Sequence, residues 1–196
     1  PAPSHSLLML VSFPSAMKAS AAVSAIFRAG IVPSCLEFME RQAILIAKNY
    51  LQDESIKIKE NTAAQLIIEV DGNHLDALYE DCEKINQVLE TFDCDEVLFA
   101  DDETTKNSLW KLRRNLNYAV KDYSAVKKAD TVVPRAALPQ LLEGIHKIGQ
   151  TQGIHAVNYG HAGDGNLHVT LLKERLSEQY WNEKMPLAMQ AIFELV

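Results

Sequence analysis

Two histidines, His161 and His168, flank a glycine-rich turn and have the clearest chemical potential in the chain. Glycine occupies three of the six positions from 160 to 165, which lets the backbone turn tightly or pass close to a ligand. Neutral imidazole is a good ligand for zinc, iron and similar divalent ions. The stretch therefore predicts a pair of metal ligands. One pair does not close a site, and an exposed loop histidine beside a polar residue on a solvated sheet face fits the same spacing.

The residues around this turn predict two strands that bring the histidines together. Residues 154–159 form the first strand, and the second has a period-two alternation whose apolar set is Leu167, Val169 and Leu171. Since that set faces a core, His168 and Thr170 share the opposite face, with Asn166 preceding them on the same side.

An arginine on a predicted helix is a second candidate for binding chemistry. Residues 103–123 have an apolar stripe at helical spacing, formed by Leu109, Leu112, Leu116 and Val120. Arg113 lies at the edge of this stripe, and Asn117 is its neighbour one turn on. Such an arginine can bury its stem while its head reaches a cleft. It can equally be a solvated or ion-paired surface residue.

Residues 160–168 resemble the Gly-His-x-Gly-Asp-Gly-Asn-x-His signature of the C-terminal domain of FAD-linked oxidases, with every fixed position kept. This family includes D-lactate dehydrogenase, the glycolate oxidase flavin subunit and D-2-hydroxyglutarate dehydrogenase. The resemblance implies that His161 and His168 hold a divalent metal such as zinc, iron or manganese, which binds the substrate's hydroxyl and carboxylate. It also implies that the turn lies beside the flavin, through Gly163, Asp164, Gly165 and Asn166.

Two further segments extend the resemblance. Residues 109–113 are similar to the family's Leu-Trp-x-hydrophobic-Arg helix, and residues 128–134 to its Lys-x-x-Asp-hydrophobic-x-x-Pro segment. The resemblance implies that Arg113 and Lys128 reach the substrate's acidic groups, with Asn117, Asn166 and Thr170 beside them. Thr170 stands where the hydroxyglutarate enzymes often have asparagine, which leaves the size of the acid open.

The resemblance makes residues 1–196 a substrate- and metal-binding cap domain of a flavin-dependent dehydrogenase. The enzyme would oxidise a small D-2-hydroxy acid, of the D-lactate, glycolate or 2-hydroxyglutarate type, by hydride transfer to FAD. Its expected partners are that acid, a flavin-binding domain of the same parent chain and an electron acceptor. The family's third metal ligand and a base candidate lie beyond residue 196, so no catalytic residue is assigned here, and we expect this chain to be inactive alone.

Two alternatives belong to other functional classes. A self-standing metal hydrolase would use His161, Asp164 and His168, because hydrolysis needs three protein ligands and an open position. A ferredoxin-like module could instead bind a small acid without chemistry. Flavin content of the full-length parent separates the first reading from both alternatives.

Composition narrows the class of protein further. The chain has 196 residues with 47% hydrophobic residues and a formal net charge of −7, which argues against nucleic acid as the main partner. It contains no apolar run of about 20 residues, so we expect no membrane-spanning segment. Cys35, Cys82 and Cys94 are widely spaced and predict free thiols in a reducing, cytoplasmic setting. A cytoplasmic protein of this kind can still contact a membrane surface through its electron acceptor. Pro1 and the unbroken helical spacing up to Val196 predict a chain cut at both ends.

Periodicity predicts an α+β fold with an antiparallel sheet, helices on one face and ferredoxin-like split βαβ units. The polar residues 52–61 predict a solvated loop. The predicted strands are residues 7–13, 31–40, 65–70, 96–100 and 131–133, together with the hairpin. The predicted helices are residues 15–29, 43–51, 75–92, 103–123 and 136–150, and a last helix from about residue 177.

Overall fold

The computed structural model describes residues 3–53, 56, 58–100 and 102–196, so part of the predicted 52–61 loop and the first two residues lie outside the described residues. The strands of the described part are β1 (His5–Phe13), β2 (Cys35–Glu40), β3 (Ala64–Gly72), β4 (Leu98–Ala100), β5 (Val126–Val132), β6 (His155–Gly160) and β7 (Asn166–Leu172). Its helices are α1 (Ala16–Arg28), α2 (Arg41–Leu51), α3 (Leu75–Leu89), α4 (Glu103–Tyr123), α5 (Leu138–Gln152) and α6 (Glu178–Phe193), with short 3₁₀ turns η1 (Glu90–Phe92), η2 (Arg135–Ala137) and η3 (Ala162–Asp164).

These strands form one sheet in the order β4-β1-β3-β2-β6-β7-β5, in which every neighbouring pair is antiparallel. Strand β3 lies between β1 and β2, and β1 lies between β3 and β4, which confirms the predicted split βαβ pattern. The second half repeats the arrangement, because β7 lies between β5 and β6. The two halves meet at a short β2–β6 pairing, Phe38 with Gly160 and Met39 with Tyr159.

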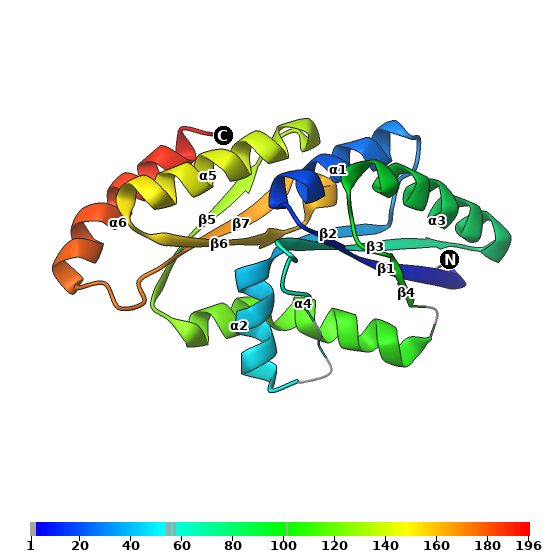
Figure 1. The fold of residues 1–196 in the computed structure, drawn as a ribbon, viewed down its shortest axis with the longest axis horizontal. Helices are drawn as coiled ribbons and strands as arrows, with labels where there is room; N and C mark the ends of the chain where they lie inside the picture. Colours follow the sequence, from blue (N-terminus) through cyan, green and yellow to red (C-terminus); the bar gives the residue numbers. More distant parts are fainter. Residues whose placement is uncertain (1–2, 54–55, 57, 101) are drawn as a thin grey trace.

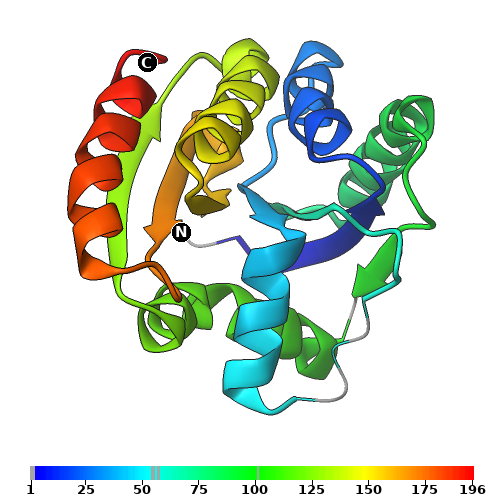
Figure 2. The same ribbon diagram turned by 60° about the vertical axis from the view of Figure 1, so that its left-hand side comes forward.

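The α+β class is confirmed, but the prediction that helices cover one face of the sheet is wrong. Helices α1, α3, α5 and α6 pack on one face, and α2 and α4 on the other (Figures 1 and 2). The reason lies in the central strands, which are apolar on both faces. In β3, Leu66 and Ile68 pack in a first hydrophobic core, on the face covered by α1, α3, α5 and α6. Ile67 packs in a second core, on the face covered by α2 and α4. A continuous apolar run of this kind is typical of a strand buried on both sides.

Three boundaries differ from the sequence prediction by three residues or more, and one of them is the start of β2, at Cys35 rather than residue 31. Strand β5 begins at Val126, well before the predicted residue 131. It is an edge strand of the sheet, where charged residues such as Lys127 remain solvated while the backbone still pairs. Helix α3 ends at Leu89, and residues 90–92 continue as a 3₁₀ turn before Asp93 adopts a left-handed conformation, φ 51°.

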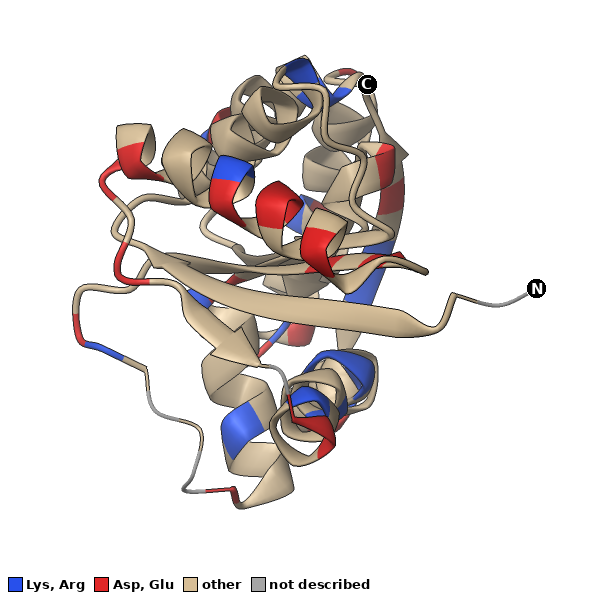
Figure 3. Ribbon diagram, turned by 90° about the vertical axis from the view of Figure 1, so that its right-hand side faces the viewer, with Lys and Arg blue, Asp and Glu red and all other residues tan. Residues whose placement is uncertain are grey.

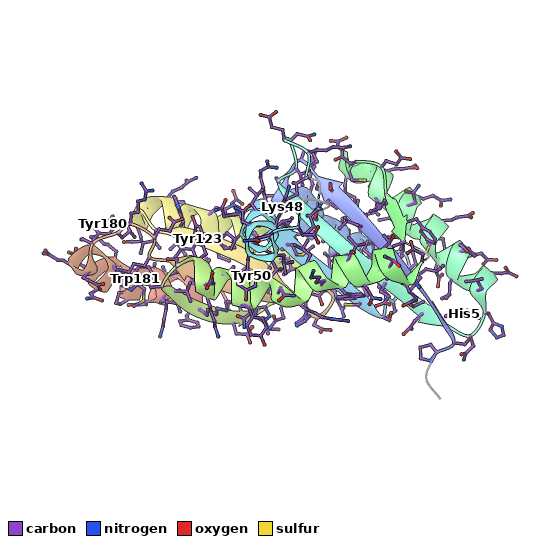
Figure 4. All side chains as sticks on the ribbon, turned by 90° about the horizontal axis from the view of Figure 1, so that it is seen from below. His5, Lys48, Tyr50, Tyr123, Tyr180 and Trp181 are labelled. Carbon is purple, nitrogen blue, oxygen red and sulfur yellow. The ribbon has the colours of Figure 1, made fainter. Side chains whose placement is uncertain are left out.

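Helix α4 runs along the lower face of the sheet, which Figure 4 shows from below. It contains the predicted Arg113. Asp102 caps its N-terminus by accepting the Thr105 N–H at 2.9 Å. Its apolar residues Leu112 and Leu116 are buried in the second core. Figure 3 shows basic positions along α4, although the chain as a whole is acidic. No helix of the described residues has the length and apolar character needed to cross a membrane.

Candidate functional site

The glycine-rich turn between β6 and β7 is the first component of the site. Gly165 has φ +74°, and a Cβ there would fall 2.0 Å from the Val133 carbonyl oxygen. A Cβ on Gly160 would fall 2.6 Å from the Asn166 carbonyl oxygen. Both positions therefore need glycine for the turn to pack this closely. The result is that the rings of His161 and His168 lie with centroids 5.6 Å apart and planes at 83°.

A carboxylate holds each of these imidazoles by its Nδ1 atom. Nδ1 of His161 lies 2.6 Å from Glu37 Oε1, and Nδ1 of His168 lies 3.0 Å from Asp130 Oδ1. Neither Nε2 has a hydrogen-bond partner among the described residues. Burial lowers the pKa of His168, and the nearby Asp130 only partly opposes this, which favours the neutral ring. Imidazoles that bind metals are commonly braced in this way by a carboxylate on the second nitrogen.

Glu37 was not predicted from the sequence, although it is buried at the centre of the site with 3% exposure. The β2–β6 pairing ends with Phe38 opposite Gly160, which brings Glu37 next to His161. Its other oxygen, Oε2, accepts a hydrogen bond from the Nε–H of Arg113 at 2.8 Å and lies 2.6 Å from Nη2 of the same guanidinium. The one available signal was an acidic residue between Leu36 and Phe38 in an apolar strand.

Arg113 is therefore an ion-paired residue, but a buried one with 9% exposure, and it faces the site. Its guanidinium lies over the ring of Tyr159, 5.7 Å from the centroid. The buried Nη2 atom lies near Glu37 without hydrogen-bond geometry and has no other partner in the described part of the chain. The arginine thus keeps donors for a further acceptor.

Lys128 approaches the same tyrosine from β5. Its Nζ donates to Asn117 Oδ1 on α4 and lies 3.4 Å from the Tyr159 hydroxyl. Burial, assisted by the positive charge of Lys121, lowers the pKa of Lys128, and burial raises the pKa of Tyr159. Thr170 is fully buried opposite Lys128 on β7. Tyr159, which the sequence analysis did not select, therefore lies between the two predicted cations.

These contacts form a closed ring on the face of the sheet that carries α4. Starting from the histidine pair, the ring passes through Glu37, Arg113 and Tyr159 and returns to His168, whose ring centroid lies 5.6 Å from that of Tyr159. Lys128 joins it through Tyr159. The structure thus brings together predicted residues that are separated by up to 55 positions in the sequence, between Arg113 and His168.

The residues predicted to contact the cofactor do not all lie in one place, unlike those predicted to bind the substrate. Asn166 donates to Asp130 Oδ1 at 2.9 Å, whereas the Asp164 side chain is exposed. Gly163 and Asp164 line a cavity of about 150 Å³ next to His161 and Arg135. Pockets for drug-sized ligands occupy about 300–1,000 Å³, so this cavity can receive only an edge of a large cofactor.

The described residues do not complete a metal site by themselves. Among them, no three His, Cys, Asp or Glu side chains come together as ligands of one ion. Asp164 therefore does not supply the third ligand that the hydrolase alternative requires. The three cysteines are free, as predicted, and burial raises the pKa of the Cys35 thiol to about 12, so it is an unreactive neighbour of Glu37.

Comparison with known proteins gives matches along the whole chain. The model of the family described as FAD linked oxidases, C-terminal domain, matches residues 2–196. Glycolate oxidase subunit GlcD of Escherichia coli (strain K12) is 35% identical over 176 residues, which are 88% of this chain and 34% of that protein. D-lactate dehydrogenase of Anaerostipes hadrus is 25% identical over 98% of this chain and 42% of its own.

A solved structure shares the fold at low sequence identity. The structure of p-cresol methylhydroxylase with substrate bound has a TM-score of 0.70 at 8% identity, over 100% of this chain and 44% of that one. At this identity the likeness concerns the fold alone. The chain spans about a third of the length of GlcD and about two fifths of the length of the D-lactate dehydrogenase.

Proposed function

The chain belongs to the family of C-terminal domains of FAD linked oxidases, and from this we propose that it is the substrate-binding cap of a flavin-dependent dehydrogenase. The substrate class that we propose is a small D-2-hydroxy acid, such as glycolate, D-lactate or D-2-hydroxyglutarate, which is oxidised to the 2-oxo acid. The relatives named as glycolate oxidase and D-lactate dehydrogenase support this class. The observation that carries the proposal is the ring of contacts joining Arg113, Tyr159 and the two histidines.

Arg113 and Lys128 are the proposed clamp for the substrate carboxylate. Both approach Tyr159, and charge-assisted hydrogen bonds from a guanidinium and an ammonium are the strong kind for a carboxylate. Glu37 already holds the Nε and Nη2 edge of Arg113, so Nη1, which is not fully buried and has no described hydrogen-bond partner, is the group available to an acid. Burial of Lys128 strengthens its attraction to an anion, because the local dielectric is low.

His161 and His168 fit a divalent ion as two of its ligands. Each Nδ1 atom is engaged by a carboxylate, which orients the ring and leaves Nε2 as the ligating atom. When bound, such an ion would act as a Lewis acid on the substrate hydroxyl. A closed site needs at least one further ligand, and none of the described residues supplies it. We propose that it comes from another part of the same enzyme.

We also propose that a separate domain of the parent chain holds most of the FAD. The small cavity beside Gly163 and Asp164 has room for a cofactor edge and no more. When bound, the flavin would supply the hydride acceptor, while this chain binds and orients the acid and shields it from water. An electron acceptor then reoxidises the enzyme.

The test is reduction of the flavin in the full-length enzyme that contains these residues. Mixed anaerobically with glycolate, D-lactate or D-2-hydroxyglutarate, the enzyme should lose its oxidised flavin absorbance with at least one acid. Chelation should lower this rate while the flavin stays bound. An enzyme that contains flavin but is reduced by none of these acids contradicts the proposed substrate class. An enzyme without flavin contradicts the proposed function as a whole.

Two neighbouring lysines provide a matched pair of variants for the clamp. Lys128→Met should lower kcat/KM by about 30- to 800-fold, because truncating one partner of a desolvated charge pair costs about 2–4 kcal/mol. Lys127→Met is the control, since Lys127 is the adjacent residue of β5 and is exposed. Equal kinetics for the two variants would remove Lys128 from the clamp.

A further inference from the structure

Glu37 differs from the other carboxylates of the site in that its two oxygens serve two different groups. Oε2 pairs with the guanidinium of Arg113, and Oε1 lies 2.6 Å from Nδ1 of His161. The thiol of Cys35 also donates to Oε1 at 3.3 Å. The Glu37 side chain is 4% exposed, so these groups replace nearly all of its water. A carboxylate buried to this extent is costly unless it is paired on both oxygens.

This pairing selects one tautomer of His161. A carboxylate oxygen can only accept, so Nδ1 carries the proton in this contact, and in the neutral imidazole Nε2 then has the lone pair. Of the two neutral tautomers, this is the one that can offer Nε2 to a metal ion or accept a proton there. Without Glu37, the His161 ring would have no described hydrogen bond to select this tautomer, and its side chain is 52% exposed.

The same carboxylate fixes the position of Arg113. It contacts the Nε and Nη2 edge, while Cζ of the guanidinium lies 5.7 Å from the centre of the Tyr159 ring. The guanidinium is planar and rigid, so holding one edge limits where the remaining N–H groups lie. An arginine that was paired only with substrate would have to be ordered at each binding event, at a cost in side-chain entropy.

Asp130 gives an internal comparison. It accepts from Nδ1 of His168 and from Asn166, but its side chain is 69% exposed and it contacts no described cation of the clamp. Asp130 can therefore orient one histidine, whereas Glu37 contacts both a histidine and the clamp. Glu37 and Asp130 differ because of their strands: β2, which carries Glu37, pairs with β6 where the two halves of the sheet meet, while β5, which carries Asp130, is an edge strand.

We propose that Glu37 is a positioning residue that presets Arg113 and His161 together, so that the acid clamp and the histidine pair form one coupled unit. This inference rests on the proposed function for its role in turnover, but its structural part concerns only this chain. Glu37→Gln is the informative variant, because glutamine has the same shape but a single acceptor oxygen. It can accept from only one of the two groups, so the other contact is lost or its donor and acceptor are reversed, which would change the His161 tautomer.

The first experiment uses the chain itself and does not depend on activity. Long-range ¹H–¹⁵N spectra of histidine side chains should show His161 as the Nδ1–H tautomer, and the Nε–H of Arg113 as a protected signal. In Glu37→Gln, at least one of these two signals should change, and the affinity for added Zn²⁺ should fall about 10-fold or more, as for loss of a group that orients a ligand. Asp130→Asn is the control and should leave the Arg113 signal unchanged.

A folded Glu37→Gln chain with both signals and Zn²⁺ affinity unchanged would overturn the proposal, even if its melting temperature fell. If that variant does not fold, Glu37→Asp retains the charge and shortens the side chain by one methylene, so the same two signals decide. In the full-length enzyme, Glu37→Gln and Arg113→Lys should each lower kcat/KM, and the double variant should lose less than the product of the two. Fully multiplicative losses would contradict coupling.

These outcomes separate the two proposals. If the spectra of the chain change as expected but the full-length enzyme oxidises no 2-hydroxy acid, the proposed function fails and the positioning role of Glu37 stands. If the enzyme oxidises such an acid and Glu37→Gln matches the wild type in spectra and kinetics, the positioning role fails and the proposed function stands.

Discussion

Replacement of Gly165 by alanine should destabilise the chain substantially, because this residue closes the turn that carries both histidines. Gly165 has φ +74°, in the left-handed region, and a Cβ there would meet the Val133 carbonyl oxygen at 2.0 Å. Two separate costs follow. An L-residue in this conformation costs about 1–2 kcal/mol, and forcing extra volume into a packed site costs about 1–3 kcal/mol.

Gly30 is the matched control for this change. It also has a positive φ, +84°, but a Cβ there would have nothing within 4 Å. Gly30→Ala therefore has the conformational cost without the steric one. The difference between the two variants isolates the contact with Val133 and should be about 1–3 kcal/mol.

The measurement is urea denaturation of the chain, followed by circular dichroism, with midpoint and slope compared between the variants and wild type. Gly165→Ala should have the lower midpoint, with an unchanged slope for both. In the histidine spectra, the signals of His161 and His168 should shift in Gly165→Ala and stay in place in Gly30→Ala. If the unfolding free energies of the two variants agree within about 0.5 kcal/mol, the tight approach of the turn to Val133 does not contribute as argued.

Two other predictions concern ion pairs on opposite faces of the sheet. Arg113→Ala should destabilise the chain by about 3–5 kcal/mol in urea denaturation, because it leaves Glu37 buried without its guanidinium partner. Arg114→Ala is the control and should change stability by less than about 1 kcal/mol, because Arg114 is exposed. Equal losses of stability in the two variants would contradict the burial argument. His146 lies 2.6 Å from Glu40, a hydrogen bond that raises its pKa, so its stabilising contribution is complete below about pH 6.5 and is lost as the pH rises through the higher folded-state pKa. The melting temperatures of wild type and His146→Gln, measured from about pH 5.5 to 8.5, should therefore converge at high pH. A difference in melting temperature that stays constant over this range would refute the prediction.

Local periodicity determined most of the elements of this chain. The α4 helix extends over the predicted residues 103–123, because its apolar stripe has helical spacing along the segment. The alternation in β7 correctly assigned Leu167, Val169 and Leu171 to the core. The hairpin was also visible, because glycines at fixed positions are a local requirement of the backbone rather than of distant contacts.

Sequence reasoning failed where a residue's environment depends on a distant strand. The β5 strand was predicted too short because Lys127 and Lys128 look like loop residues until they are placed on a sheet edge. The helices were assigned to one face because the apolar run in β3 does not tell which helix covers which side. In both cases, the deciding information is the order of strands in the sheet.

The sequence alone predicted that His161 and His168 are a pair of metal ligands and that Arg113 can reach a cleft, since residue type and local spacing are properties of the chain, and the family resemblance added Lys128 as an acid-binding residue. Only the tertiary structure decided that Glu37 joins two of them. Glu37 and His161 are 124 positions apart, and they meet because β2 pairs with β6 at one register. A period-two pattern tells which face of a strand is buried, but it does not specify the partner strand or the register. A carboxylate in an apolar strand therefore gains its role only when the two halves of the sheet are joined.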